Sequence, residues 1–190
     1  MIKSEWAIWK NLFTPKECDS IIERAYQNEF EDSTVGNPIY GGQKINHDYR
    51  KSRIQWMGRD RFDDVFDKLW KSTIEVNQEY FGFHIDFLPS LQFTEYDESY
   101  QGEFKHHNDM IWMTEHDRHR KLSCIIHLTD PNEFEGCQLN MECESQDFPL
   151  KDTTRGTVVW FHALATHWVT PITKGRRNSV VCWFEGPQWR

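Results

Sequence analysis

The sequence lacks long apolar runs and an excess of positive charge. No stretch approaches the roughly 20 apolar residues of a membrane-spanning helix. The N-terminal segment MIKSEWAIWKNLF carries charges and has no small-residue cleavage site, so it does not match a signal peptide. With 22 Lys and Arg against 30 Asp and Glu, the net charge is −8. An acidic protein repels phosphate backbones, so we expect neither a membrane nor a nucleic acid as a partner.

Cysteine is present five times, but never as a C-x-x-C pair. The odd number and the lack of a signal peptide predict reduced thiols in a cytoplasmic protein, most of them in the core. In contrast, nine tryptophans and thirteen phenylalanines are present. Aromatic side chains favour strands and pocket walls.

The length suits one domain with one core, and no linker or repeat divides it. We expect residues 1–190 to form a single domain, in which 1–82 supply helical support and a loop and 83–190 form the core. The polar segment 29–50 contains several glycines and is predicted to be a long loop or an irregular hairpin. Long loops in compact domains are often lids over functional sites, and a plain surface excursion is the alternative.

Two helices are predicted in the N-terminal part. The first begins after Thr14, an N-cap residue whose capping box Glu17 completes, and it fades near Asn28. The second runs from about Asp60 to Tyr80, where apolar residues recur at helical spacing.

After Gly82 the sequence changes to short β-type runs divided by turn-rich segments. The predicted strands are 90–96, 122–129, 138–142, 157–161, 167–171 and 179–184, in addition to 52–57 between the helices. Two helices followed by many short strands predict a mainly β (α+β) fold, an antiparallel barrel or jelly roll with both helices packed outside one sheet.

His107-Asn108-Asp109 forms an H-x-D motif of candidate metal ligands. On a strand, side chains at i and i+2 point to the same face. His167, at the start of another β-type run, is a candidate third ligand. Two histidines and one aspartate on one side of a metal form a facial triad with open positions for non-haem Fe(II). The same ligand types also form hydrolytic zinc sites.

A second H-x-D motif, His84-Ile85-Asp86, competes with the first, because the pattern alone is weak. The segment after His167 reads as strand, turn and strand, and it returns Arg177 to the level of His167. A fixed guanidinium there can hold a carboxylate with two hydrogen bonds. The combination suggests an iron site with an anionic co-substrate.

These residues make the chain resemble the 2-oxoglutarate- and Fe(II)-dependent oxygenases, specifically their prolyl 4-hydroxylase-like branch. The resemblance covers about Gln92 to the C-terminus and, more loosely, the helices and Arg50-Lys51-Ser52. The matching segments are 92–96, 102–109 with the H-x-D motif, 120–130, 135–139, 156–161 and, most specifically, H-x-V-x-P at 167–171 with Gly175 and Arg177. The order of these segments favours His107 and Asp109 over His84 and Asp86, which precede the first matching strand.

The resemblance implies a double-stranded β-helix (jelly roll) with Fe(II) at one mouth, bound by His107, Asp109 and His167. It also implies 2-oxoglutarate as co-substrate and allows ascorbate as a reductant. The other implied site residues are Arg177 against the distal carboxylate of 2-oxoglutarate, Tyr96 at its chelating end, His127 in place of a tyrosine that bonds the distal carboxylate, and Ser123 and Trp183 in the pocket wall. Two positions depart from the family pattern: Phe104 stands where a tyrosine is frequent, and Cys137 replaces a glycine.

Four neighbouring polar residues are expected to take no direct part in the site. His106 should face away from His107 on its strand, and Arg176 should point outward beside Arg177. His119 and Lys121 lie in a charged stretch and are predicted to be solvated.

The resemblance implies that the protein hydroxylates an unactivated C–H bond with O2 and 2-oxoglutarate, releasing succinate and CO2. A prolyl residue in a peptide or protein is the leading substrate, and a free amino acid or another small molecule is the alternative. A non-catalytic jelly roll that binds a partner is disfavoured by the complete triad with Arg177. A zinc hydrolase is disfavoured because no general-base glutamate stands beside the histidines.

Overall fold

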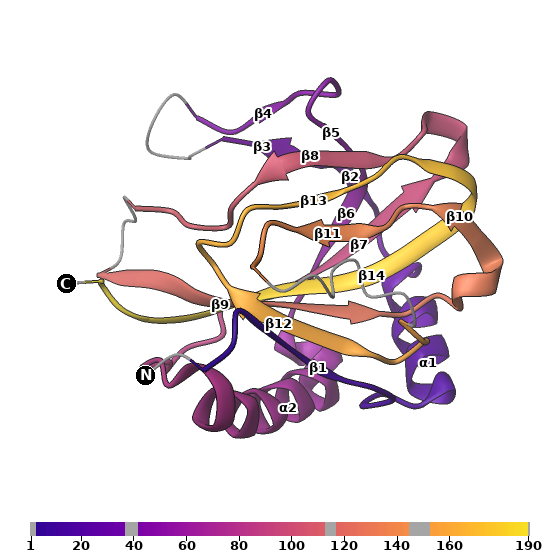
Figure 1. Cartoon of the computed structure of the whole chain (residues 1–190). Helices are drawn as coiled ribbons and strands as arrows, with labels where there is room; N and C mark the ends of the chain where they lie inside the picture. Colours follow the sequence, from indigo (N-terminus) through magenta and orange to yellow (C-terminus); the bar gives the residue numbers. More distant parts are fainter. Residues whose placement is uncertain (1–2, 37–41, 113–116, 145–152, 190) are drawn as a thin grey trace.

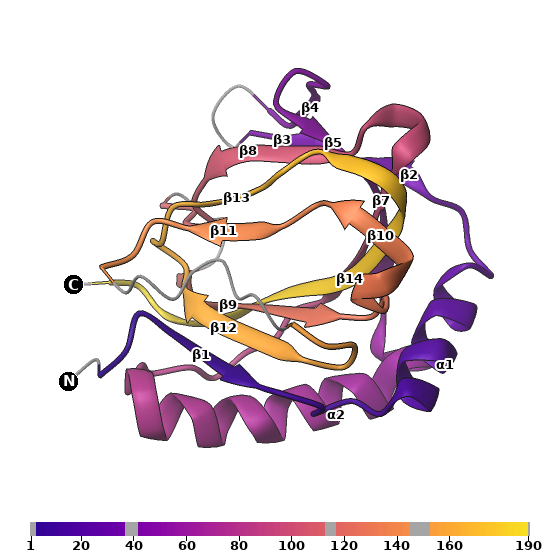
Figure 2. The same cartoon turned by 45° about the vertical axis from the view of Figure 1, so that its right-hand side comes forward.

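Two antiparallel sheets face each other as a jelly roll in the computed structural model, which describes residues 3–36, 42–112, 117–144 and 153–189 (Figures 1 and 2). The major sheet has the strand order β1-β12-β9-β14-β7-β6-β2, with β10 also paired to β14, and the minor sheet has the order β11-β13-β8-β5. The predicted fold class is confirmed.

The strands of the major sheet are β1 (Trp6–Trp9), β2 (Glu31–Asp32), β6 (Arg53–Met57), β7 (Leu91–Asp97), β9 (Arg118–His127), β10 (Phe134–Gly136), β12 (Val158–His162) and β14 (Ile172–Pro187). Those of the minor sheet are β5 (Arg50–Lys51), β8 (Glu103–His107), β11 (Leu139–Met141) and β13 (His167–Val169). A separate two-stranded sheet joins β3 (Thr34–Val35) and β4 (Lys44–Ile45). The first 82 residues thus contribute strands to both large sheets as well as helices.

Helix α1 (Pro15–Ala25) begins with the predicted capping box. The Thr14 hydroxyl accepts from the Glu17 backbone N–H at 3.3 Å, and the Glu17 carboxylate accepts from the Thr14 N–H at 2.7 Å. These two bonds satisfy N–H groups that the first helical turn leaves without partners. The helix ends three residues before the predicted Asn28.

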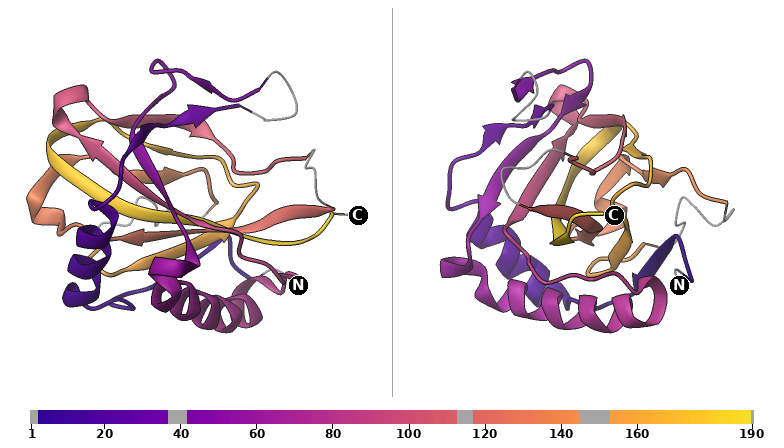
Figure 3. Two further views of the ribbon diagram at one scale, coloured as in Figure 1. Left: turned by 180° about the vertical axis from the view of Figure 1, so that it is seen from behind. Right: turned by 90° about the vertical axis from the view of Figure 1, so that its left-hand side faces the viewer.

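Helix α2 (Arg59–Val76) continues into a π-helical turn, Asn77–Phe81, so together they cover the predicted helical range. Its buried face packs on the outer side of the major sheet, and Figures 2 and 3 show both helices on this one side of the molecule. The Trp160 indole N–H on β12 donates to the Thr73 hydroxyl at 2.8 Å, a buried bond between helix and sheet. Burial of apolar side chains in this layer supports the major sheet from outside.

A second core fills the space between the two sheets. Its buried apolar side chains come from both of them, among them Ile125, Phe161 and Val169. Position 175 within β14 needs a glycine, because a Cβ at its φ of 74° would collide with the Glu133 carbonyl oxygen. This close approach joins β10 to β14 and holds the strand that carries Arg177. No helix in the described part of the chain is long and apolar enough to span a membrane.

Candidate active site

His107, Asp109 and His167 converge at one end of the jelly roll, where β8 ends and β13 begins (left side of Figure 1). The two histidines are direct partners across the β8–β13 pair. Their ligand atoms and those of Asp109 lie within 4.8 Å of one another. Asp109 lies 3.5 Å from the His167 Nε2 and 4.0 Å from the His107 Nε2. Two metal–ligand bonds of about 2.1 Å would span up to about 4.2 Å, so both distances from Asp109 to the histidines suit a shared ion.

Asp109 is not on the strand that carries His107, so the expectation that the H-x-D motif uses strand alternation was wrong. β8 ends at His107. The Asn108 side chain then accepts from the Met110 N–H at 3.1 Å, and the Asp109 N–H donates to the Ala163 carbonyl at 2.9 Å. A short turn fixed to the loop after β12 therefore aims the carboxylate.

The residues around the triad fit a divalent metal ion. Each histidine has its Nδ1 bonded to a backbone carbonyl, from His107 to Lys105 at 2.7 Å and from His167 to Ala165 at 3.0 Å. Nδ1 must carry the proton to donate, which leaves the Nε2 lone pairs for a metal. The predicted Ser123 lies beside the triad, where its hydroxyl donates to Asp109 Oδ2 at 2.6 Å and leaves Oδ1 open.

The protonation states suit metal binding as well. Burial, followed by the nearby His167, lowers the pKa of His107 to about 4, so its ring is neutral at pH 7. Burial opposes ionisation of Asp109, but His167, His107 and Arg120 outweigh it and hold its pKa below the ordinary value. Neutral imidazoles and an ionised carboxylate are the ligand forms that bind a metal.

Arg177 lies deeper between the sheets in a second polar cluster. It is 3% exposed, and its Nη2 donates to His127 Nδ1 at 3.4 Å. Its Nη1 lies 3.9 Å from the Cys137 sulfur, and its guanidinium carbon lies 5.7 Å from the centre of the Tyr96 ring. Arg177 has no carboxylate partner within 4.0 Å among the described residues. A buried guanidinium without a counter-charge suits a carboxylate ligand.

His127 adds an unpaired donor to this cluster. A guanidinium can only donate, so Nδ1 accepts and Nε2 carries the proton. Nε2 is buried and has no partner in the described structure. Burial, and then the charge of Arg177, hold the pKa of His127 well below its ordinary value, so the ring is neutral near pH 7. The cluster thus contains a second buried donor without a partner in the described structure, in addition to the Arg177 guanidinium.

Trp183 lies at a cleft on the other side of the triad. The cleft has a volume of about 310 Å³. Its lining residues are Thr34, Val35, Gly36, Gln43, Tyr49, Arg50, Ile54, Trp56, Gln92, Phe104, His107, Asn108, Asp109, Met110, Ile111, Arg120 and Trp183. Tyr96, His127 and Arg177 are not among these described lining residues. The predicted site residues therefore form two regions, a buried polar cluster and an open cleft, that meet at the metal ligands.

The cleft contains two arginines that the sequence did not identify as site residues. Arg50 lies with its guanidinium 4.5 Å from the centre of the Phe104 ring, and that ring stacks on His107 with a centroid distance of 3.5 Å. Arg120 donates to the Asp109 backbone carbonyl at 3.3 Å. Strand alternation could not have assigned Arg120 reliably, because the β9–β14 register shifts between Phe184 and Glu185.

Three other positions can be compared with their predictions. His106 and Arg176 are exposed, as expected. In contrast, His119 is buried and bonds Trp112 and Trp189, and Lys121 is buried with its ammonium 3.6 Å from the centre of the Trp189 ring. The charged residues around His119 and Lys121 suggested a solvated stretch, and they gave no sign that Trp189 covers both side chains.

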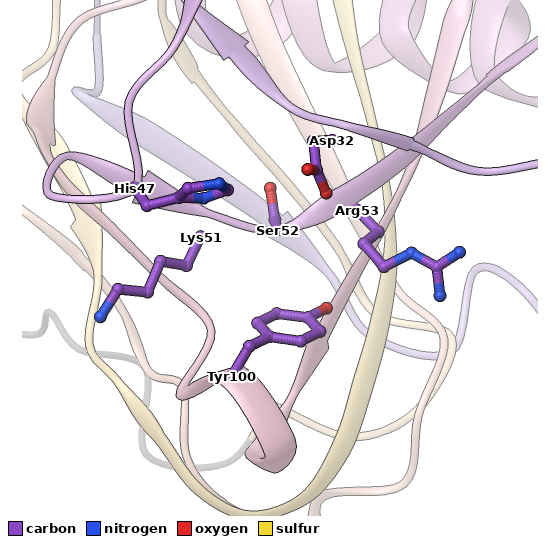
Figure 4. A pocket seen from close by; sticks show the side chains of 6 residues that line it. All are labelled: Asp32, His47, Lys51, Ser52, Arg53 and Tyr100. Atoms are coloured by element: carbon purple, nitrogen blue, oxygen red, sulfur yellow. The ribbon is translucent and has the colours of Figure 1, made fainter.

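The competing motif lies outside the jelly roll. His84 and Asp86 are exposed, and Asp86 forms an ion pair with Arg118. A further pocket of about 340 Å³ also lies apart from the triad, lined by Asp32, His47, Lys51, Ser52, Arg53 and Tyr100 (Figure 4). The charged ends of Lys51 and Arg53 extend in opposite directions in Figure 4, so this pocket does not gather a set of catalytic groups.

Comparison with known proteins gives consistent matches. A model of the 2OG-Fe(II) oxygenase superfamily matches residues 91–185, half of the chain. A PKHD-type hydroxylase of Colwellia psychrerythraea is 22% identical over 138 residues, covering 71% of this chain and 60% of the relative. A PKHD-type hydroxylase of Pseudoalteromonas atlantica is 33% identical over 64 residues, which are 34% of this chain and 28% of the relative. The chain thus spans less than two thirds of the length of these curated relatives.

Solved structures share the fold over nearly the whole chain. A prolyl-4-hydroxylase of Pseudomonas putida has a TM-score of 0.74 at 16% identity, covering 96% of this chain and 93% of that one. The viral collagen prolyl hydroxylase of Paramecium Bursaria Chlorella virus-1, in complex with 2OG, has a TM-score of 0.69 at 18% identity, covering 96% and 97%. At such identities the likeness establishes the fold.

Proposed function

Because the chain belongs to the 2OG-Fe(II) oxygenase superfamily, we propose that it hydroxylates an unactivated C–H bond with Fe(II), 2-oxoglutarate and O2. The observation that carries the proposal is the convergence of His107, Asp109 and His167 in a fold that also contains Arg177, a buried arginine without a carboxylate partner in the described structure. Three protein ligands leave open positions on a six-coordinate metal. A hydrolytic zinc enzyme would not need the second polar cluster.

Each residue of the site has a role that follows from its chemistry. His107 and His167 offer neutral Nε2 atoms, Asp109 offers Oδ1, and Ser123 holds the carboxylate in place. Arg177 and the Nε2–H of His127 bind the distal carboxylate of 2-oxoglutarate. When bound, iron supplies the oxidising chemistry that converts 2-oxoglutarate and O2 into succinate, CO2 and a hydroxylated product.

Tyr96 and Trp183 complete the two sides of the reaction site. The buried Tyr96 ring lines the region between Arg177 and the triad, and burial raises the pKa of its hydroxyl, which stays protonated. Trp183 forms the cleft wall, with the Trp56 ring 6.4 Å away. The protein thus positions the reactants and limits access of water more than it supplies acid–base groups.

The leading substrate is a prolyl residue in a peptide or protein. Four aromatic side chains line the open cleft, namely Tyr49, Trp56, Phe104 and Trp183, and flat aromatic walls suit a compact apolar ring. Several proteins that share the fold are prolyl hydroxylases, and one of them, from Trichoplax adhaerens, was solved with a peptide fragment. A free amino acid or another small molecule is the second candidate, because a cleft of about 310 Å³ can hold it entirely.

Segment 29–50 is proposed as a lid over the cleft. Its described residues Thr34, Val35, Gly36, Gln43 and Tyr49 line the cleft, and β3 and β4 project beyond β8 in Figure 1. Residues 37–41 lie outside the described part of the chain. Replacing 33–46 by a short turn should abolish hydroxylation but spare substrate-independent decay of 2-oxoglutarate. Equal loss of both activities would argue against a lid.

A direct test is to incubate the iron-loaded protein with 2-oxoglutarate, O2 and proline-containing peptides, with ascorbate as the proposed reductant. The proposal predicts a peptide that gains one oxygen atom together with one succinate. The Asp109→Ala protein is the control. Hydrolysis of a substrate without any use of 2-oxoglutarate would contradict the proposal.

The five free cysteines support the cytoplasm as the proposed compartment.

A further inference from the structure

Arg50 and Arg120 bring two positive charges to the cleft, close to the metal ligands. Arg50 is 8% exposed, and one ring, Phe104, separates its guanidinium from His107. Arg120 stacks on Trp183, with its guanidinium carbon 3.9 Å from the ring centre, and bonds the Asp109 backbone. Asp109 is the one acidic residue among the cleft residues that the structure describes.

Neither arginine forms an ion pair within 4.0 Å among the described residues. Arg50 donates to the Ser52 hydroxyl at 2.9 Å and to the Gln92 amide oxygen at 3.0 Å, both uncharged, and its Nη1 has no hydrogen-bond partner among the described residues. Burial lowers the pKa of Arg50, because a charged guanidinium loses favourable hydration when it is buried in this site. Burial also lowers the pKa of Arg120, against the opposing charges of Asp109 and then Glu185, and neither carboxylate forms an ion pair with Arg120 within 4.0 Å in the described chain.

The charges of the co-substrates do not remove this excess. Fe(II) and Arg177 supply three positive charges, and Asp109 and the two carboxylates of 2-oxoglutarate supply three negative ones, so that set is balanced. Arg50 and Arg120 then remain as two uncompensated cations. The Trp183 indole N–H is buried and also has no partner in the described structure. Among the described cleft residues, positive charge and free donors are therefore set against a single carboxylate, Asp109.

We infer that the hydroxylated substrate carries a carboxylate, and that Arg50 and Arg120 bind it beside the metal. This inference rests on the proposed function and narrows its substrate class. The carboxylate can be the terminal group of a free amino acid or the side chain of an acidic residue next to the target in a peptide. In a protein of net charge −8, two arginines that line one cleft also attract such an anion selectively.

The test uses two ligand pairs that differ in one charge: L-proline with L-prolinamide, and a blocked Pro-Asp peptide with its Pro-Asn counterpart. Binding is measured by calorimetry to protein loaded with Mn(II) and 2-oxoglutarate, so that no turnover occurs. The variants are Arg50→Gln and Arg120→Gln, with Arg53→Gln on the outer surface as the matched control. Arg50→Lys keeps the charge and covers the case in which Arg50→Gln does not fold.

In at least one pair, the carboxylate ligand should bind about tenfold or more tightly than its amide, because hydrogen bonds between charged groups contribute at least that much. The preference should disappear in Arg50→Gln or Arg120→Gln and persist in Arg53→Gln and Arg50→Lys. The pair that responds identifies the source of the carboxylate.

Equal binding of both members of each pair, including no binding of either, overturns the inference. Loss of 2-oxoglutarate binding in Arg50→Gln or Arg120→Gln alone also overturns it, because the arginine would then serve the co-substrate. If the unmodified protein binds neither Mn(II) nor 2-oxoglutarate, the proposed function itself fails, and that outcome is distinct from the other two.

Discussion

His107-Asn108-Asp109 and His84-Ile85-Asp86 share one sequence pattern but lie in different surroundings. Asp109 is 8% exposed, accepts from Ser123 and faces His167 across the end of the jelly roll. Asp86 lies on the outer surface, where it pairs with Arg118. The metal site differs from the surface motif in two ways: a third ligand comes from a neighbouring strand, and hydrogen bonds orient each ligand. The H-x-D sequence pattern specifies neither of these features.

The largest effect should separate the two aspartates. Asp109→Ala removes the only anionic ligand of the triad, so iron-dependent succinate formation should fall below detection. Asp86→Ala breaks a surface ion pair worth at most about 1 kcal/mol and should leave activity unchanged. Succinate assays on both proteins check this. Normal activity of Asp109→Ala would show that Asp109 is not a metal ligand. Loss of activity in a folded Asp86→Ala protein would instead point to His84-Ile85-Asp86 as the metal-binding motif.

A second contrast uses two adjacent arginines, one inside and one outside. Arg177 is buried beside His127, whereas the exposed Arg176 bonds Asp97 at 2.7 Å. Arg177→Ala should weaken 2-oxoglutarate binding by about 1.5–3 kcal/mol, roughly tenfold to a hundredfold. Arg176→Ala should leave that affinity unchanged. Calorimetry of 2-oxoglutarate binding to the Mn(II)-loaded proteins gives both values, and similar affinities in the two variants would rule out Arg177 as the carboxylate partner.

A smaller effect is expected from Ser123, which touches the metal ligand but not the metal. Ser123→Ala removes the bond to Asp109 Oδ2 and should weaken metal binding by about tenfold, since such supporting contacts contribute 10- to 100-fold. Ser72→Ala is the control, because Ser72 is also buried but bonds only the backbone of α2. Metal titrations compare them. Unchanged affinity in Ser123→Ala would mean that the turn alone orients Asp109.

The smallest effect concerns the pH dependence of stability. Burial and then Arg177 lower the pKa of His127 in the folded protein, so below about pH 6.5 the unfolded chain binds a proton that the folded protein does not. The stability present above pH 6.5 is therefore lost as the pH falls, by up to about 1.4 kcal/mol per pH unit. In His127→Gln the free energy of unfolding should fall less steeply with decreasing pH, because the unfolded chain then takes up one proton fewer. Urea titrations from pH 7 to 5 measure it, with His106→Gln as the exposed control, and an unchanged slope would place a proton acceptor near His127.

The sequence predicted both helices because their determinants are local, but it missed short strands such as β1 and β10. The capping box at Thr14 marks the start of α1, and helical apolar spacing marks α2. His107, Asp109 and His167 were identified because a short, ordered set of motifs carries them. The resemblance placed Ser123 in the pocket wall, whereas Ser123 is fully buried behind Asp109 and is not among the described cleft residues. The roles of Arg177 and His127 stay predictions.

What the sequence could not predict depends on contacts between distant residues. Arg50 belongs to the cleft because β5 pairs with β8, more than fifty residues later in the chain. Arg120 enters it next to a shift in the β9–β14 register. Lys121 and His119 are buried because Trp189 covers them. Local composition carries no signal for any of these contacts.

The most direct test of the central claim is an anaerobic titration of the metal-free protein with Fe(II) and 2-oxoglutarate, followed by visible absorption. The account predicts a weak charge-transfer band that requires both components, disappears when O2 is admitted and leaves succinate. The band should form in Asp86→Ala and not in Asp109→Ala. No band in the unmodified protein, or an undiminished band in Asp109→Ala, would contradict the assignment of this end of the jelly roll as the iron site.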